Sequence, residues 1–320
     1  MQRRLKEYLI ITVKGVAMGA ADVIPGVSGG TIAFISGIYE ELIKSLDNLS
    51  LDVFKIWKTS GFKVAWHSIN GNFLLALFSG IAISILSLAK VIKWLLINEP
   101  TLLWAFFFGL VLSSIIYIAK QIKSWNILTL IAIAVTTILS YWITLAEPFA
   151  SPDSSVYLLF CGFIAIIAMI LPGVSGAFIL LILGAYQTAI NTINNLLEGI
   201  AKSNFELFKE AFINFLLLAI GAVIGLKVFS KILNWMFQNK KNTTLAILTG
   251  FMIGSLNKIW PWKKTLTWRI DSHNEKTPFL EKSISPFSFE GDNQLLWAIV
   301  LMILGFLIIF ILEKLGSKKQ

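Results

Sequence analysis

Long apolar stretches set the strongest limit on how this chain can fold. Six of them approach the roughly 20 residues that a helix needs to cross a bilayer. They cover residues 73–97, 101–119, 125–146, 212–237, 244–260 and 295–313. Charged residues make up only 14% of the chain, whereas a soluble domain carries about 25%. The sequence therefore predicts an all-α polytopic membrane protein and excludes soluble, disordered and disulfide-rich secreted classes, since Cys161 is the only cysteine.

Four shorter apolar stretches form two pairs, 8–43 and 156–190, and one sequence pattern interrupts both pairs. The first motif is Pro25-Gly26-Val27-Ser28-Gly29-Gly30, and the second motif is Pro172-Gly173-Val174-Ser175-Gly176-Ala177. Non-helical backbone at membrane depth is tolerated only where it is buried in protein or lines a wet cavity. We therefore expect each pair to be a broken, re-entrant helical hairpin.

The two motifs lie 147 positions apart, and the same offset aligns further identical residues such as Tyr39 with Tyr186. We predict two repeats, 1–150 and 151–320, each a hairpin followed by three of the six spans. Because each unit crosses the membrane an odd number of times, the second unit should be inverted relative to the first. Paired inverted repeats with broken helices are typical of secondary transporters.

Loop charges predict the orientation. With the N-terminus in the cytoplasm, the positive charges of Arg3, Arg4 and Lys6 fall inside, while the short outer connections 98–100 and 147–155 carry only acidic charges. Short loops decide orientation by the positive-inside rule, so we expect both termini in the cytoplasm. The net charge of +9 then reflects loops that face anionic lipid rather than nucleic acid. The polar segment 261–293 is expected to be an external loop.

The motifs suggest an anion site. A helix that restarts after such a break exposes unpaired N–H groups and the positive end of its dipole. Ser28 or Ser175 can cap that helix, and Thr31 adds a hydroxyl in the first copy. Two half-helices that point at one midplane site could hold a phosphate through both motifs. The alternative is that the motifs are only packing kinks, in which glycines allow close helix contact.

Two charged residues inside the first hairpin are further candidates. Asp22 and Lys14 align with Met169 and Cys161 in the second copy, so the fold does not require either charge. Ionisable residues at membrane depth are costly and are functional candidates by default. Asp22 could carry a coupling proton or Na⁺, and Lys14 could offer positive charge to a phosphate. The alternatives are a capping role for Asp22, and snorkelling or pairing with Asp22 for Lys14.

No pattern in the sequence indicates an enzyme or a cofactor. There is no Ser-His-Asp, P-loop or HExxH pattern, and His67 and His273 lack metal-ligand spacing. Five lysines near helix ends are expected to snorkel to the interface; these are Lys90, Lys93, Lys227, Lys231 and Lys258. Segment 51–69, which Gly61 interrupts, could lie along the cytoplasmic interface.

Residues 19–31, Gly-Ala-Ala-Asp-Val-Ile-Pro-Gly-Val-Ser-Gly-Gly-Thr, followed by 37–43, closely resemble the PopT-type polyprenyl-phosphate transporter family. That family was long catalogued as a prokaryotic domain of unknown function, and the second motif also resembles its pattern. The resemblance implies a protein of the prokaryotic cytoplasmic membrane that returns undecaprenyl phosphate to the cytoplasmic leaflet for envelope synthesis. The resemblance does not extend to a role for segment 261–293, which is left open.

The leading hypothesis is therefore a lipid-phosphate translocase. The phosphate headgroup of the lipid would lie between the motifs, and its polyprenyl tail would stay in the bilayer through a lateral opening. Asp22 would couple transport to the electrochemical gradient. A carrier or channel for a small soluble anion is the alternative, and a closed aqueous pore instead of a lateral groove would favour it. An intramembrane lipid-phosphate enzyme is less favoured, because no basic-His or metal cluster exists. The sequence does not define the oligomeric state, and a homo-oligomer is compatible with it.

Overall fold

The computed structural model describes residues 3–22, 27–50, 52–147, 155–270 and 276–317. This part of the chain is nearly all helical, which confirms the predicted class of polytopic, all-α membrane protein. The helices of the first half are α1 Leu5–Asp22, α2 Gly29–Ile35, α3 Tyr39–Asn48, α4 Asp52–Ser60, α5 Phe62–Ser68, α6 Gly71–Asn98, α7 Pro100–Lys120 and α8 Ile127–Leu145. The second half contains α9 Ser155–Ile170, α10 Gly176–Ile182, α11 Tyr186–Ala201, α12 Phe205–Asn239, α13 Lys241–Ser255, β1 Lys263–Ile270, β2 Lys276–Ser283, the 3-10 turn Pro286–Ser288 and α14 Leu295–Ser317.

Four described helices are long and apolar enough to cross a membrane. They are α7, α8, α12 and the Gly71–Leu88 part of α6, and the bent pair α10 and α11 would add a fifth if it counts as one span. Of the other two predicted spans, α14 covers 23 residues, whereas α13 has only 15. Length alone therefore does not mark α13 as a span.

Each predicted hairpin contains three helical segments rather than two. We expected 29–43 and 176–190 to continue without a break, but Gly37 and Gly184, at φ 73° and 70°, end α2 and α10. In the first copy the Gly37 amide donates to Phe34 O and the Ile38 amide to Ala33 O, both at 3.0 Å. This is the Schellman arrangement that a left-handed glycine completes at a helix C-terminus. The chain then turns sharply, by 110° between α10 and α11.

The helices pack in corresponding pairs. Helix α1 lies along α6 and α9 along α12, while α8 packs on α13 and α7 on α14. Glycines allow the close crossings: a Cβ added to Gly80 would overlap the carbonyl oxygen of Thr12, and one added to Gly221 would overlap that of Leu159. Small residues at such contacts let membrane helices approach backbone to backbone. The third span of each half is thus packed against the second span of the other half.

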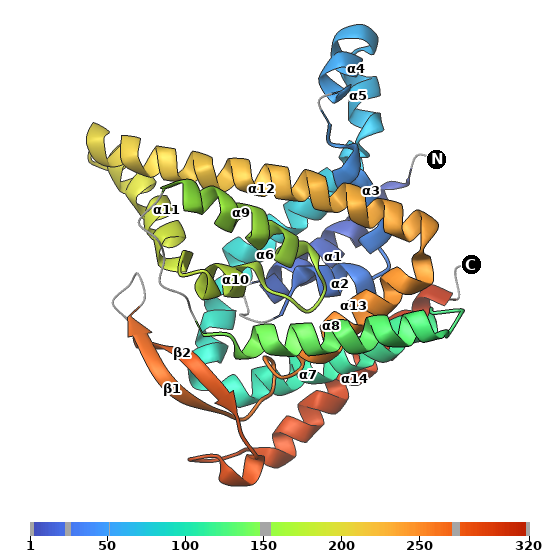
Figure 1. Ribbon diagram of the computed structural model, residues 1–320, viewed down its shortest axis with the longest axis vertical. Coiled ribbons are helices and arrows are strands. Elements are labelled where there is room, and N and C mark those ends of the chain that lie inside the picture. The colour runs from blue at the N-terminus through green and yellow to red at the C-terminus, as the bar shows by residue number, and fades with distance from the viewer. Residues whose placement is uncertain (1–2, 23–26, 51, 148–154, 271–275, 318–320) are drawn as a thin grey trace.

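Two appendages leave this helical body (Figure 1). Helices α4 and α5 project from one edge, and Gly61 at φ 87° separates them. The segment 261–293, which we expected to be a polar loop, instead contains the antiparallel pair β1 and β2. Two tryptophans next to the pair fix its base, since Trp260 Nε1 donates to Ile284 O and Trp262 Nε1 donates to Asn293 O, both at 2.9 Å.

Candidate functional site

The structure brings the two motifs into direct contact. The Ser28 hydroxyl lies 3.3 Å from the carbonyl oxygens of Met169 and Leu171. The Gly173 amide donates to Thr31 Oγ1 at 2.9 Å. Residues more than 140 positions apart in sequence thus hold each other at the two breaks. Pro25 and Gly26 lie outside the described residues, and Pro172 is buried.

At the first motif, the protein itself supplies an anion to the start of α2. Asp22 Oδ1 accepts a hydrogen bond of 2.6 Å from the Gly29 amide, and Ser28 Oγ accepts one of 3.1 Å from the Gly30 amide. A Cβ added to Gly29 would lie 2.8 Å from Asp22 Cγ, so only glycine admits the carboxylate here. Residues 27–31 are all buried. The capping role that we weighed as the alternative for Asp22 is therefore a contact present in the structure.

The second motif differs at the corresponding place. Ser175 Oγ accepts a 3.4 Å hydrogen bond from the Phe178 amide, as the predicted cap requires. Met169 stands where the first copy has Asp22, so no carboxylate reaches the start of α10. Among the described residues, the amides of Gly176 and Ala177 have no hydrogen-bond partner. Since Ala177 is exposed and Gly176 is partly exposed, these two amides are accessible backbone donors at the start of α10.

Lys14 does not pair with Asp22 in the structure. Its ammonium donates to the carbonyl oxygen of Ser36 at 2.5 Å. Ser36 is the C-cap residue of α2. A cation at a helix C-terminus is favourable, because the last carbonyl groups lack partners and the dipole is negative there. Lys14 thus contacts the opposite end of α2 from Asp22, and its predicted contact with a phosphate remains a prediction.

Two of the lysines that we expected to snorkel have other contacts. Lys258 Nζ lies 4.4 Å from the centre of the Phe178 ring, which places a positive charge beside α10. Lys227 Nζ pairs with Asp47 Oδ1 at 3.3 Å, so that α12 is tied to α3. Sequence reasoning missed Lys258 because its position near the end of the predicted span 244–260 suggested only an interfacial role. The sequence signal that pointed to Lys258 is its position one helical turn after Gly254, at the end of α13.

Tyr39 is a further residue that sequence reasoning did not propose for the site. Its hydroxyl donates to Ile170 O at 3.0 Å, and its side chain is buried. The bond joins the start of α3 to the end of α9, directly before the second motif. Its signal was the match with Tyr186 at the offset of 147, which we used only as evidence for a repeat.

The base of the β-hairpin carries a buried cation. Lys263 Nζ lies 3.7 Å from the centre of the Trp104 ring and 3.6 Å from Glu281 Oε2. Burial lowers the pKa of Lys263 to about 8, with a smaller contribution in the same direction from Lys258, while Glu281 opposes the shift. A cation over a tryptophan face is attracted by the ring quadrupole, so these contacts fasten the hairpin to the first turns of α7.

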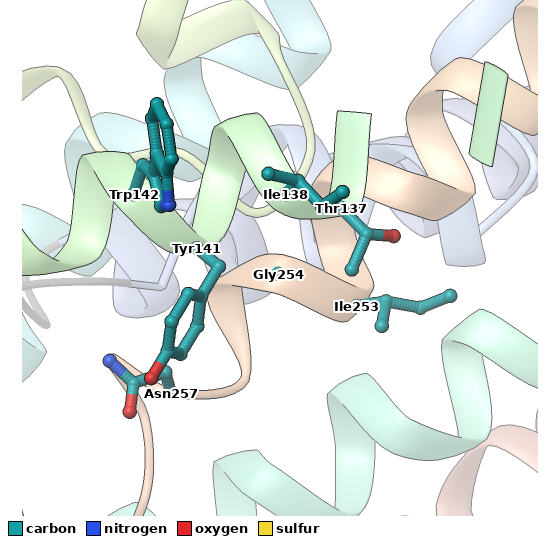
Figure 2. A pocket seen from close by; sticks show the side chains of 7 residues that line it. All are labelled: Thr137, Ile138, Tyr141, Trp142, Ile253, Gly254 and Asn257. Carbon is teal, nitrogen blue, oxygen red and sulfur yellow. The ribbon is translucent and has the colours of Figure 1, made fainter. Parts of the chain in front are cut away.

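Two cavities flank the motifs without containing them. One is a groove of about 460 Å³ between α8 and α13, shown in Figure 2. The other, of about 640 Å³, is more polar and lies between α3, α5 and the end of α12. Among the residues that the structure describes, no group of three His, Cys, Asp or Glu side chains could hold a metal ion.

Comparison with known proteins gives two kinds of match. The family model described as VCA0040-like, undecaprenyl phosphate translocase-like, matches residues 18–277. A "Polyprenyl-phosphate transporter" of Vibrio cholerae serotype O1 is 42% identical over 99% of this chain and 100% of its own length. A protein of the same name from Staphylococcus aureus is 27% identical over 78% of this chain and 85% of its own length. No solved structure matches the chain.

Proposed function

Because this chain belongs to the undecaprenyl phosphate translocase-like family, we propose that it moves polyprenyl phosphate across the prokaryotic cytoplasmic membrane, toward the cytoplasmic leaflet. The family match covers most of the chain, and the Vibrio cholerae relative aligns along its whole length. Transport across a bilayer also agrees with the helices long and apolar enough to span it. The resemblance carried by residues 19–31 and 37–43 points to the same substrate.

The phosphate group binds at the start of α10 in this proposal. The observation that carries it is the pair of amides, Gly176 and Ala177, which lack partners among the described residues and directly follow the helix-capping residue Ser175. Backbone N–H groups aimed at one point favour an anion without any side-chain charge. The ammonium of Lys258 lies over the ring of Phe178, a residue of α10. Because the lysine side chain is flexible, it can bring a positive charge to a phosphate at the start of α10.

Asp22 couples transport to protons in this proposal. As long as its carboxylate holds the Gly29 amide, the start of α2 is already occupied by an anion. A phosphate at the second motif and a carboxylate at the first repel each other, because the two motifs are in contact. Protonation of Asp22 removes that repulsion and weakens its bond to Gly29, so the lipid phosphate and a proton bind together. Na⁺, the other coupling ion that the sequence suggests, would also neutralise this carboxylate and is the alternative to the proton.

The two halves, 1–150 and 151–320, act as inverted repeats around this site. Three facts support that arrangement: α2 and α10 begin 147 residues apart, they have equal length, and the packing pairs of the two halves correspond. An inverted pair gives a carrier two equivalent ways to open, one to each side of the membrane. With the N-terminus in the cytoplasm, the β-hairpin lies outside and α4 and α5 lie inside.

Reconstitution tests the function. The purified protein in liposomes should move a fluorescently labelled polyprenyl phosphate between leaflets, and an imposed pH gradient should change the rate. An excess of inorganic phosphate should compete poorly, since the free ion brings no lipid tail. If inorganic phosphate is carried and the lipid is not, the protein is a soluble-anion carrier and the proposal is wrong.

A further inference from the structure

We propose that the groove between α8 and α13 holds the part of the isoprenoid chain closest to the phosphate. This inference rests on the proposed function, because it assigns a place to the tail of the same lipid. The groove is lined by one face of α8 and the end of α13; its residues are Thr137, Ile138, Tyr141, Trp142, Ile253, Gly254 and Asn257. Figure 2 shows these side chains around the opening.

The walls of the groove suit an apolar chain that enters from the bilayer. Ile138 and Trp142 are 55% and 69% exposed, and both lie on a helix that presents most of its surface to the outside of the protein. The volume of about 460 Å³ falls in the range of small-molecule pockets, about 300–1,000 Å³. A long polyprenyl tail is larger than such a pocket, so only its first units would fit and the rest would remain in lipid.

Helix α13 separates the groove from the second motif. Its Gly254 faces the groove, while its Ser255 and Met252 face the motif: a Cβ added to Gly173 would lie 2.7 Å from Ser255 Oγ and 3.0 Å from Met252 Cα. The groove and Gly173 of the second motif therefore lie on two sides of one helix. A lipid with its phosphate at the second motif has its tail beside the groove once it passes the end of α13.

The end of α13 is polar and fixed in place. Asn257 Nδ2 donates to Thr144 Oγ1 at 2.8 Å, and Ser283 Oγ of β2 donates to Asn257 Oδ1 at 3.0 Å. Tyr141 points its hydroxyl toward Asn257 (Figure 2), and this hydroxyl has no hydrogen-bond partner among the described residues. The next residue after Asn257 is Lys258, which reaches Phe178 of α10. The groove is thus apolar along its length and polar at the end that adjoins the phosphate site.

Selection in such a groove comes from shape. A tail that moves from lipid into protein gains no hydrophobic free energy, because lipid chains are as apolar as the groove. Close packing against Ile138, Trp142 and Ile253 can still distinguish the methyl-branched isoprenoid chain from a straight acyl chain. Side-chain filling of the groove should therefore disturb the handling of polyprenyl lipids.

The test compares two tryptophan substitutions on neighbouring exposed residues of α8. Ile138→Trp fills the groove, and the matched control Leu139→Trp, at a residue 47% exposed that does not line it, changes only the lipid-facing surface. In liposomes, we expect Ile138→Trp to slow transport of undecaprenyl phosphate by about tenfold, the size expected when a larger side chain overfills a packed site. Leu139→Trp should match the wild type. Equal rates for the two variants would overturn the inference.

Photolabelling gives an independent measurement. An undecaprenyl phosphate analogue with a diazirine on its first isoprene units should label residues 137–142 or 253–257. Unlabelled undecaprenyl phosphate should suppress that labelling, and phosphatidic acid with straight acyl chains should not. Suppression by both lipids would show a general lipid contact and overturn the inference. A wild-type protein that moves no polyprenyl phosphate would instead refute the proposed function, so the two failures are distinguishable.

Discussion

Replacement of Asp22 tests the proposed proton coupling most directly. The Asp22 carboxylate accepts a 2.6 Å hydrogen bond from the Gly29 amide. A hydrogen bond to a charged group contributes about 1.5–3 kcal/mol, and a neutral one about 0.5–1.5 kcal/mol. Asp22→Asn keeps an oxygen that can accept from Gly29 and removes the charge, so this contact should weaken by roughly 1–1.5 kcal/mol. Asp22→Ala removes the acceptor and leaves the amide unpaired.

The two variants separate a cap from a coupling group. If Asp22 only caps α2, Asp22→Asn should transport like the wild type and Asp22→Ala should lose stability. If Asp22 carries the proton, Asp22→Asn should resemble the protonated state and bind lipid phosphate at least as tightly as the wild type. Its transport should nevertheless no longer respond to a pH gradient. Met169→Ala, at the corresponding position of the second copy, is the control and should have little effect.

The assay is the rate of transport of labelled undecaprenyl phosphate in liposomes at a series of imposed pH gradients. Equilibrium binding of the same lipid to the detergent-solubilised variants is measured alongside, and the amount of inserted protein is determined separately. A gradient response of Asp22→Asn equal to that of the wild type would refute the coupling argument and leave Asp22 as a structural cap.

Three further predictions follow from the geometry of the site. Ser175→Ala should weaken binding of lipid phosphate by about tenfold or more in an equilibrium assay, through loss of a hydrogen bond to an anion, whereas Ser28→Ala should change it less, because the Ser28 hydroxyl contacts the carbonyl oxygens of Met169 and Leu171; wild-type affinity of Ser175→Ala would limit that serine to capping. Met169→Asp should place a carboxylate beside the Gly176 amide, as Asp22 lies beside Gly29, and abolish phosphate binding at neutral pH; unchanged binding would place the phosphate elsewhere. Lys263, with its pKa lowered to about 8 from 10.5, binds fewer protons when the hairpin is docked than when it is released, so docking should strengthen as pH rises from about 8 to 10.5. Limited proteolysis of the hairpin at pH 7.5 and 9.5, scored relative to Lys263→Met at each pH, should show that gain in protection, and a constant ratio would contradict it.

Hydropathy and the repeated motif predicted much of the architecture. The spans fall close to their predicted ranges, and the helices after the two motifs begin at residues 29 and 176, as the offset of 147 requires. The second break in each hairpin was missed because the sequence stays apolar through Gly37 and Gly184, and a hydropathy average does not register a single glycine. Positive φ at these two residues ends the helices, and the Gly-x-Tyr sequence shared by both copies was the available signal.

The contacts of the site were harder to predict, because they join residues across the breaks. A carboxylate seven residues before Gly29 is far outside the spacing of an ordinary helix cap, so only the folded chain shows that Asp22 reaches that amide. The same holds for Thr31 and Gly173, which meet across the two halves. The sequence predicts a loop where the β-hairpin lies, because the many charged residues of the segment mask the alternation of polar Thr265, Thr267 and Arg269 with apolar Leu266, Trp268 and Ile270 along the first strand.

The packing of the third span of each half against the second span of the other half has a consequence for the biogenesis of the protein. Helix α8 packs on α13 and α7 on α14, and both partners are synthesised more than 100 residues after the helices that they cover. The nascent first half must therefore leave the translocon with two unmatched seams, and these seams close only when translation is almost complete. The halves 1–150 and 151–320, produced as separate polypeptides, should each be degraded when expressed alone and should rescue each other when coexpressed.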